Sequence, residues 1–96
     1  MPTTPLRLID SAEAFPPQKN RRVGLLAWGG VFRSPQAFAT VRNLSDRGDL
    51  REAAANLFRY LRELDALGLD LIVAERVPSR ELGAAIMDRL ERASHR

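Results

Sequence analysis

The chain has 96 residues, a formal net charge of +3, 45% hydrophobic and 28% charged residues, and no cysteine. This length and composition predict one small globular domain with a packed core. Without cysteine, disulfides, thiolate metal ligands and a cysteine nucleophile are all excluded. The positive charges are nearly all arginines scattered among acids, which is typical of a mixed-charge surface. The one dense basic cluster, Lys19, Arg21 and Arg22, leaves open a contact with phosphate or an acidic partner.

The first half of the chain contains three short segments that favour β-strands. The first is LRLI at 6–9, which is followed by a single helical turn predicted at 10–15. The second is RVGLLAW at 22–28, a continuous apolar run that is typical of a strand buried on both faces in a parallel sheet. The third is FATVRNLS at 38–45, which polar residues interrupt.

The clearest helix of the sequence begins after Asp49. Asp49 can cap its first turn, and Glu52 three residues later completes a capping-box pattern. Gly68 supplies the left-handed residue that ends the helix, and DLIVAE at 70–75 follows as a β-strand. Apolar residues recur at helical spacing along one face of this helix: Leu50, Ala53, Ala54, Leu57, Leu61 and Leu64.

A second helix is predicted to open at Pro78 and Ser79. In it, Asp88 and Arg92 lie four residues apart with the acid first, the favourable order for an ion pair. The predicted apolar stripe consists of Leu82, Ala85, Ile86, Leu90 and Ala93. Strands and helices joined by short connections predict an α/β fold, a small three-layer sandwich with a mostly parallel sheet that is loosely Rossmann-like.

The loop AWGGVFRS at 27–34 holds candidates for ligand binding. It leaves the carboxyl end of a predicted strand, where open α/β sheets bind their ligands. Backbone amides at Gly29 and Gly30 could approach a phosphate, with Arg33 as its counter-charge and Ser34 beside it. However, neither G-x-G-x-x-G nor G-K-[ST] is present, so an ordinary structural turn is favoured over a ligand or domain contact.

The residue types argue against catalysis within these 96 residues. His95 is the only histidine, so neither a Ser-His-Asp triad nor a His-ligated zinc site can be assembled. The longest uncharged stretch, 23–32, is far shorter than the roughly 20 apolar residues that span a bilayer. The N-terminus lacks the layout of a signal peptide. We therefore expect a soluble, cytoplasmic binding or structural module with no metal site.

Residues 53–94, from AAANLFRYLRELDALGLDLIVAE to LGAAIMDRLERAS, carry a family resemblance. The order NLF-x-x-LR-x-LD-x-x-G-x-D, LIVAE and LG-x-AI-x-DRL-x-RA resembles the C-terminal accessory domain of two-domain L-threonylcarbamoyladenylate synthases. In that family the domain follows a YrdC-type catalytic domain. The beginning, PTTPLRLI and then RRVGLLAW, is similar to the point where the interdomain linker meets this domain. The resemblance thus implies a single accessory domain over 1–96, with 1–5 as a linker remnant.

The resemblance implies a role in making threonylcarbamoyladenosine, a modified nucleoside of tRNA. The family's enzyme condenses threonine, bicarbonate and ATP into threonylcarbamoyl-AMP, and this chemistry belongs to the catalytic domain. Whether the chain itself is an enzyme stays open. We expect a non-catalytic domain that docks on the catalytic domain, in cis or in trans, and helps gate release of ATP or the intermediate. ATP and magnesium are implied only for the intact synthase, direct contact with tRNA is not expected, and the oligomeric state stays open.

The alternative is a free-standing module that binds a nucleotide or phosphate at the 27–34 loop. No catalytic residue is carried over from the family. Asp88, Arg89 and Arg92 are candidates for facing a partner, although they also fit a solvated helix face with one ion pair. Glu81 stands where the family commonly has the first glycine of G-L-G. If that position needs a positive φ, glutamate costs roughly 1–2 kcal/mol there; otherwise Glu81 begins the helix one residue earlier.

Overall fold

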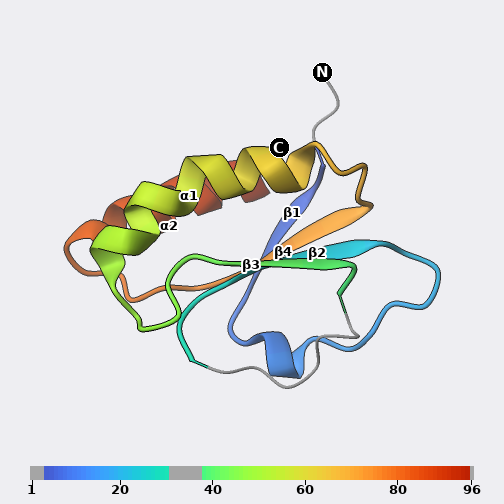
Figure 1. The fold of residues 1–96 in the computed structure, drawn as a ribbon, viewed down its shortest axis with the longest axis horizontal. Helices are drawn as coiled ribbons and strands as arrows, with labels where there is room; N and C mark the ends of the chain where they lie inside the picture. Colours follow the sequence, from blue (N-terminus) through green and yellow to red (C-terminus); the bar gives the residue numbers. More distant parts are fainter. Residues whose placement is uncertain (1–3, 31–37, 96) are drawn as a thin grey trace.

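The structure is a computed structural model that describes residues 4–30 and 38–95 (Figure 1). Within these residues four strands form one parallel sheet in the order β1-β4-β2-β3. Two α-helices and one short 3-10 turn, η1, accompany the sheet. The elements are β1 Leu6–Ile9, η1 Ala12–Ala14, β2 Val23–Ala27, β3 Thr40–Asn43, α1 Leu50–Asp65, β4 Leu71–Glu75 and α2 Leu82–Ser94.

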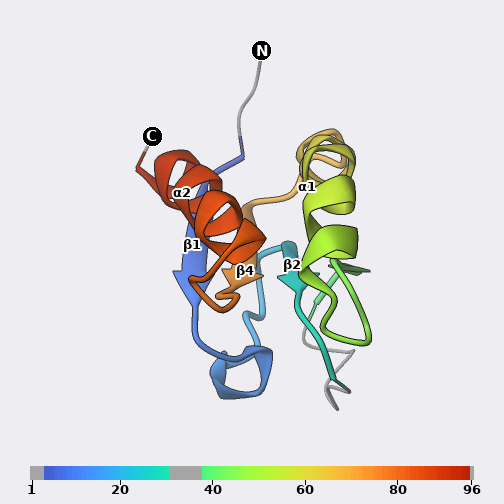
Figure 2. The ribbon, with the colours of Figure 1, turned by 90° about the vertical axis from the view of Figure 1, so that its left-hand side faces the viewer.

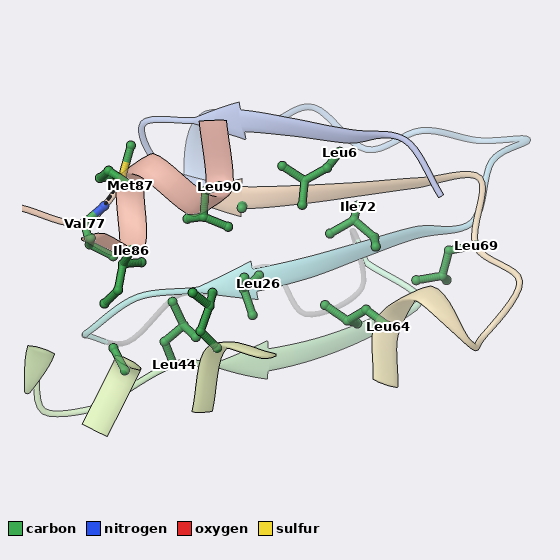
Figure 3. Packing of buried hydrophobic residues seen from close by; sticks show 13 residues of the cluster. Leu6, Leu26, Leu44, Leu64, Leu69, Ile72, Val77, Ile86, Met87 and Leu90 are labelled. Carbon is green, nitrogen blue, oxygen red and sulfur yellow. Dashed lines mark hydrogen bonds between the residues drawn. The ribbon is translucent and has the colours of Figure 1, made fainter. Parts of the chain in front are cut away.

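The two α-helices lie side by side on one face of the sheet, whereas η1 lies on the opposite face (Figures 1 and 2). The helix side carries the larger part of the core, which includes Leu26 and Ile72 from the sheet and Leu64 and Leu90 from the helices (Figure 3). On the other side, Phe15 and Phe38 stack with their ring centroids 5.9 Å apart over the sheet. The predicted α/β fold with a parallel sheet is therefore confirmed, with a third layer that contains η1.

The complete burial of the central strand β2 explains why this strand could be predicted from a continuous apolar run. All five of its residues, Val23–Ala27, are buried, as expected for a strand with neighbours on both sides and cover on both faces. The strand order is not the 3-2-1-4-5-6 order of the dinucleotide-binding fold. The likeness to a Rossmann fold is therefore limited to a parallel sheet with helical cover.

Helix α1 begins where predicted, but its cap differs from the capping box. The Asp49 carboxylate accepts the backbone N–H groups of Arg51 and Glu52, as expected. The predicted return bond from the Asp49 N–H to the Glu52 carboxylate is wrong, because that N–H donates to Ser45 Oγ at 2.9 Å. Ser45 in turn donates its hydroxyl hydrogen to Glu52 Oε1. A buried serine from the preceding turn thus links the two acids.

Helix α2 begins at Leu82, so the predicted opening at Pro78 and Ser79 is wrong. Glu81 has φ 52° and ψ −128°, a strained conformation that excludes the alternative in which Glu81 begins the helix. Two members of the predicted stripe are also wrong, since Leu82 is 43% exposed and Ala85 lies in solvent. The buried face consists of Gly83, Ile86, Met87 and Leu90. Gly83 lies so close to the Pro78 carbonyl that a Cβ atom there would overlap its oxygen.

Candidate functional site

The start of the loop after β2 is held by hydrogen bonds to Glu75 and Ser45. The two carboxylate oxygens of Glu75 accept the backbone N–H groups of Ala12 and Trp28, each at 2.7 Å. The Gly29 N–H donates to the Ser45 carbonyl at 2.9 Å. Glu75 is thus the residue that joins the ends of β4 and β2 to the η1 segment.

Gly29 and Gly30 both adopt positive φ, 64° and 45°, so glycine suits this turn conformationally. The N–H of Gly29 is already used within the protein, and a carboxylate lies at the neighbouring Trp28 N–H. Both features disfavour an anion at the first part of the turn. Arg33 and Ser34 lie outside the described residues, so the ligand role of this loop stays a prediction.

A groove lies between α1 and α2 beside the beginning of β1. Its volume is about 160 Å³, and Leu6 and Ile72 contribute to its apolar lining. Its polar lining comes from Thr4, Arg62, Asp65 and Arg89. The Thr4 N–H donates to Asp65 Oδ1 at 2.6 Å, so the segment before β1 is fastened at the edge of this groove.

Phe58 and Arg89 form the contact between the two helices at the groove. Phe58 is 55% exposed although it is a large aromatic residue. The guanidinium carbon of Arg89 lies 5.0 Å from the centre of the Phe58 ring, a cation–π arrangement. The Nε atom of Arg89 is buried and has no hydrogen-bond partner. The groove therefore combines exposed aromatic surface with an incompletely satisfied cation.

The three residues proposed from sequence on α2 are separated by the structure. Asp88 and Arg92 form the predicted ion pair, with 3.2 Å between Oδ2 and Nη2, and both side chains are largely exposed. Arg89 alone lines the groove. Sequence reasoning missed Phe58, Arg62 and Asp65 as groove residues. The signal that could have identified Phe58 was its position as an aromatic residue next to the apolar stripe of α1.

The basic cluster near the N-terminus is exposed, but Arg22 within it forms hydrogen bonds to another segment of the protein. Lys19, Arg21 and Arg22 are all exposed. Arg22 Nη1 donates to the Leu67 carbonyl at 3.3 Å, and the Arg22 N–H donates to Asp70 Oδ2 at 2.7 Å. Arg22 therefore fastens this loop to the turn between α1 and β4.

Residues 4–30 and 38–95 contain no group of three side chains from His, Cys, Asp and Glu that could hold a metal ion. No helix in this part of the chain is long and apolar enough to cross a bilayer.

The parallel sheet and the two helices on one of its faces define a small α/β domain. The chain belongs to the family described as threonylcarbamoyl-AMP synthase, C-terminal domain, whose model matches residues 1–95. The resemblance found in the sequence is thereby confirmed.

Two relatives place this domain within larger proteins. The chain is 36% identical over 77 residues to a threonylcarbamoyl-AMP synthase of Pyrococcus abyssi, covering 80% of this chain and 21% of the relative. It is 36% identical over 80 residues to the synthase of Bacillus subtilis, covering 80% of this chain and 22% of the relative. The chain therefore spans about a fifth of the length of the curated relatives it matches.

A solved structure has the same fold. The crystal structure of Pyrococcus abyssi Sua5 complexed with L-threonine superposes with a TM-score of 0.75 at 27% sequence identity. The match covers 98% of this chain and 29% of that one. The L-threonine belongs to that protein, and the present chain corresponds to less than a third of it.

Proposed function

We propose that this chain is the non-catalytic accessory domain of a threonylcarbamoyl-AMP synthase and acts in threonylcarbamoyladenosine modification of tRNA. In this role it docks on the YrdC-type catalytic domain and helps gate the release of ATP or of the intermediate. ATP and magnesium belong to the catalytic domain, and the assembled protein works in the cytoplasm. The observation that carries the proposal is the family match over residues 1–95.

The geometry supports an accessory role through the surface of the domain. The described residues present a groove with an exposed aromatic ring, Phe58, and two arginines, Arg62 and Arg89, which suits a contact between domains. Interfaces between domains of one chain are typically modest in area and fairly polar, and this surface has that mixed character.

The test compares three forms of the Pyrococcus abyssi relative: intact, lacking the C-terminal region that this chain matches, and truncated with this chain supplied separately. The rates of threonylcarbamoyl-AMP formation and release are measured for each. We expect truncation to change at least one rate and the added chain to move it back toward the intact value. The chain alone should form no threonylcarbamoyl-AMP.

A folded basic protein of similar size serves as the control for non-specific effects of added protein. Unchanged rates after truncation, together with no binding of the added chain, would contradict the accessory role. Synthesis by the chain alone would contradict its non-catalytic character.

A further inference from the structure

We infer that the groove between α1 and α2 is the docking face, and that it receives a carboxylate and an adjacent apolar side chain from the catalytic region of the synthase. This inference rests on the proposed accessory function and specifies the surface and the partner chemistry. Phe58 offers the apolar contact, and Arg89 with Arg62 offers the positive charge.

The size of the groove favours a protein side chain over a nucleotide. Its volume is about 160 Å³, whereas sites for drug-sized ligands commonly span roughly 300–1,000 Å³. Its lining is more apolar than polar and includes Leu6 and Ile72 from neighbouring strands of the sheet. A space of this kind accepts one or two side chains of a docked surface.

The charge of the groove indicates an acidic partner. Within residues 4–30 and 38–95, Arg62 and Arg89 both line the groove and neither forms an ion pair. Asp65, the acid in the groove lining, accepts the Thr4 N–H. The Nε of Arg89 is buried and lacks an acceptor, so this guanidinium is incompletely satisfied within the described residues. A partner carboxylate would bind its Nη groups, and arginine suits it because its planar group can bind both oxygens.

The position of the groove indicates where that partner comes from. The matched region is the C-terminal domain of the relatives and about a fifth of their length, so most of their chain precedes it. Thr4 leads into β1 and lies at the groove, fastened to Asp65. A polypeptide arriving from the catalytic region therefore passes this surface. The catalytic region is therefore the expected partner of the groove. The experiment below distinguishes it from a second copy of this chain.

Phe58 and Arg89 also have the character of interface hot spots. Aromatic residues and arginine are enriched among the side chains that dominate binding energy. The cation–π contact holds the two side chains against each other, 5.0 Å apart, before any partner arrives. This pre-arrangement lowers the entropy lost on docking.

The experiment is a titration of the ¹⁵N-labelled chain with the unlabelled catalytic region of the Pyrococcus abyssi synthase, followed by amide chemical shifts. We expect the largest shifts at Phe58, Arg62, Arg89 and Ala93. Phe58→Ala and Arg89→Gln should each weaken the dissociation constant about tenfold or more. The matched controls are Leu82→Ala and Arg51→Gln, which remove exposed side chains outside the groove and should change it by less than about twofold.

Each outcome decides the inference. Shifts at the groove together with selective weakening by the two groove variants support it. Binding with shifts elsewhere, and with both variants at wild-type affinity, overturns the groove assignment but leaves the accessory function standing. No binding by the wild-type chain overturns the groove assignment, and the rates of the truncated synthase then decide whether the accessory function stands. Concentration-dependent shifts at the groove in the free chain, abolished by Phe58→Ala, would assign the surface to self-association instead. The amide spectrum of each variant also reports whether it is folded.

Discussion

Gly83, the second residue of α2, packs directly against the carbonyl group of Pro78. A Cβ atom at Gly83 would overlap the Pro78 oxygen and would lie 3.2 Å from Leu50 Cδ2. The first contact is with backbone, which cannot move aside as the end of a flexible side chain can. The start of α2 is therefore fixed by an approach that only glycine permits.

We expect Gly83→Ala to lower the free energy of unfolding by about 3 kcal/mol, at the upper end of typical overpacking costs. The comparison is Gly68→Ala, where φ is 69° but nothing lies within 4 Å of an added Cβ. That change should cost only about 1 kcal/mol, from backbone strain alone. Urea denaturation of the three proteins measures both values. Equal losses in the two variants would show that the Pro78 contact can relax.

Glu81 holds the strained conformation at the N-terminus of α2, with φ 52° and ψ −128°. Glycine adopts such angles without a steric penalty, so Glu81→Gly should raise the free energy of unfolding by about 1 kcal/mol. Glu81→Ala removes the same carboxylate but keeps the Cβ, and should give no gain. The difference between the two variants in urea denaturation isolates the backbone term. A gain of the same size for alanine would attribute the effect to charge.

Elements that a local residue pattern determines could be predicted from the sequence. Features that depend on contacts between distant segments could not. The continuous apolar run of β2 and the Asp49 cap of α1 carry their own signals, and both elements lie where expected. The start of α2 is set by the Gly83–Pro78 contact, which no periodicity records. Similarly, Ser45 replaces part of the capping box because the turn before α1 folds back onto it.

The groove was beyond sequence reasoning for the same reason. Phe58 and Arg89 come from different helices, and no spacing rule connects residues so far apart. Their pairing follows only once both helices lie on the same face of the sheet (Figure 2). The predicted stripe of α2 placed Leu82 and Ala85 on the buried face, whereas Gly83 and Met87 occupy it. Glycine has no side chain to mark a buried face in an apolar pattern.

Glu75 should contribute more to stability than an exposed acid, because it accepts two backbone N–H groups from different segments. Each of its oxygens binds one of them, Ala12 or Trp28, at 2.7 Å. Glutamine has a single acceptor oxygen, so Glu75→Gln leaves one N–H facing an amide NH₂. We expect a loss of about 1–3 kcal/mol in the free energy of unfolding.

The matched control for this change is Glu63→Gln, which removes an ion pair with Arg42 on the surface of the sheet edge. Both side chains of that pair are partly exposed, so its loss should cost less than about 1 kcal/mol. Urea denaturation gives the two values, and amide hydrogen exchange at Ala12 and Trp28 should accelerate only in Glu75→Gln. If exchange at both amides stayed at the wild-type rate, Glu75 would not be what holds the β2 loop to the η1 segment. The turn at Gly29 would then depend on its bonds to the Ser45 carbonyl and to the Asn43 side-chain amide.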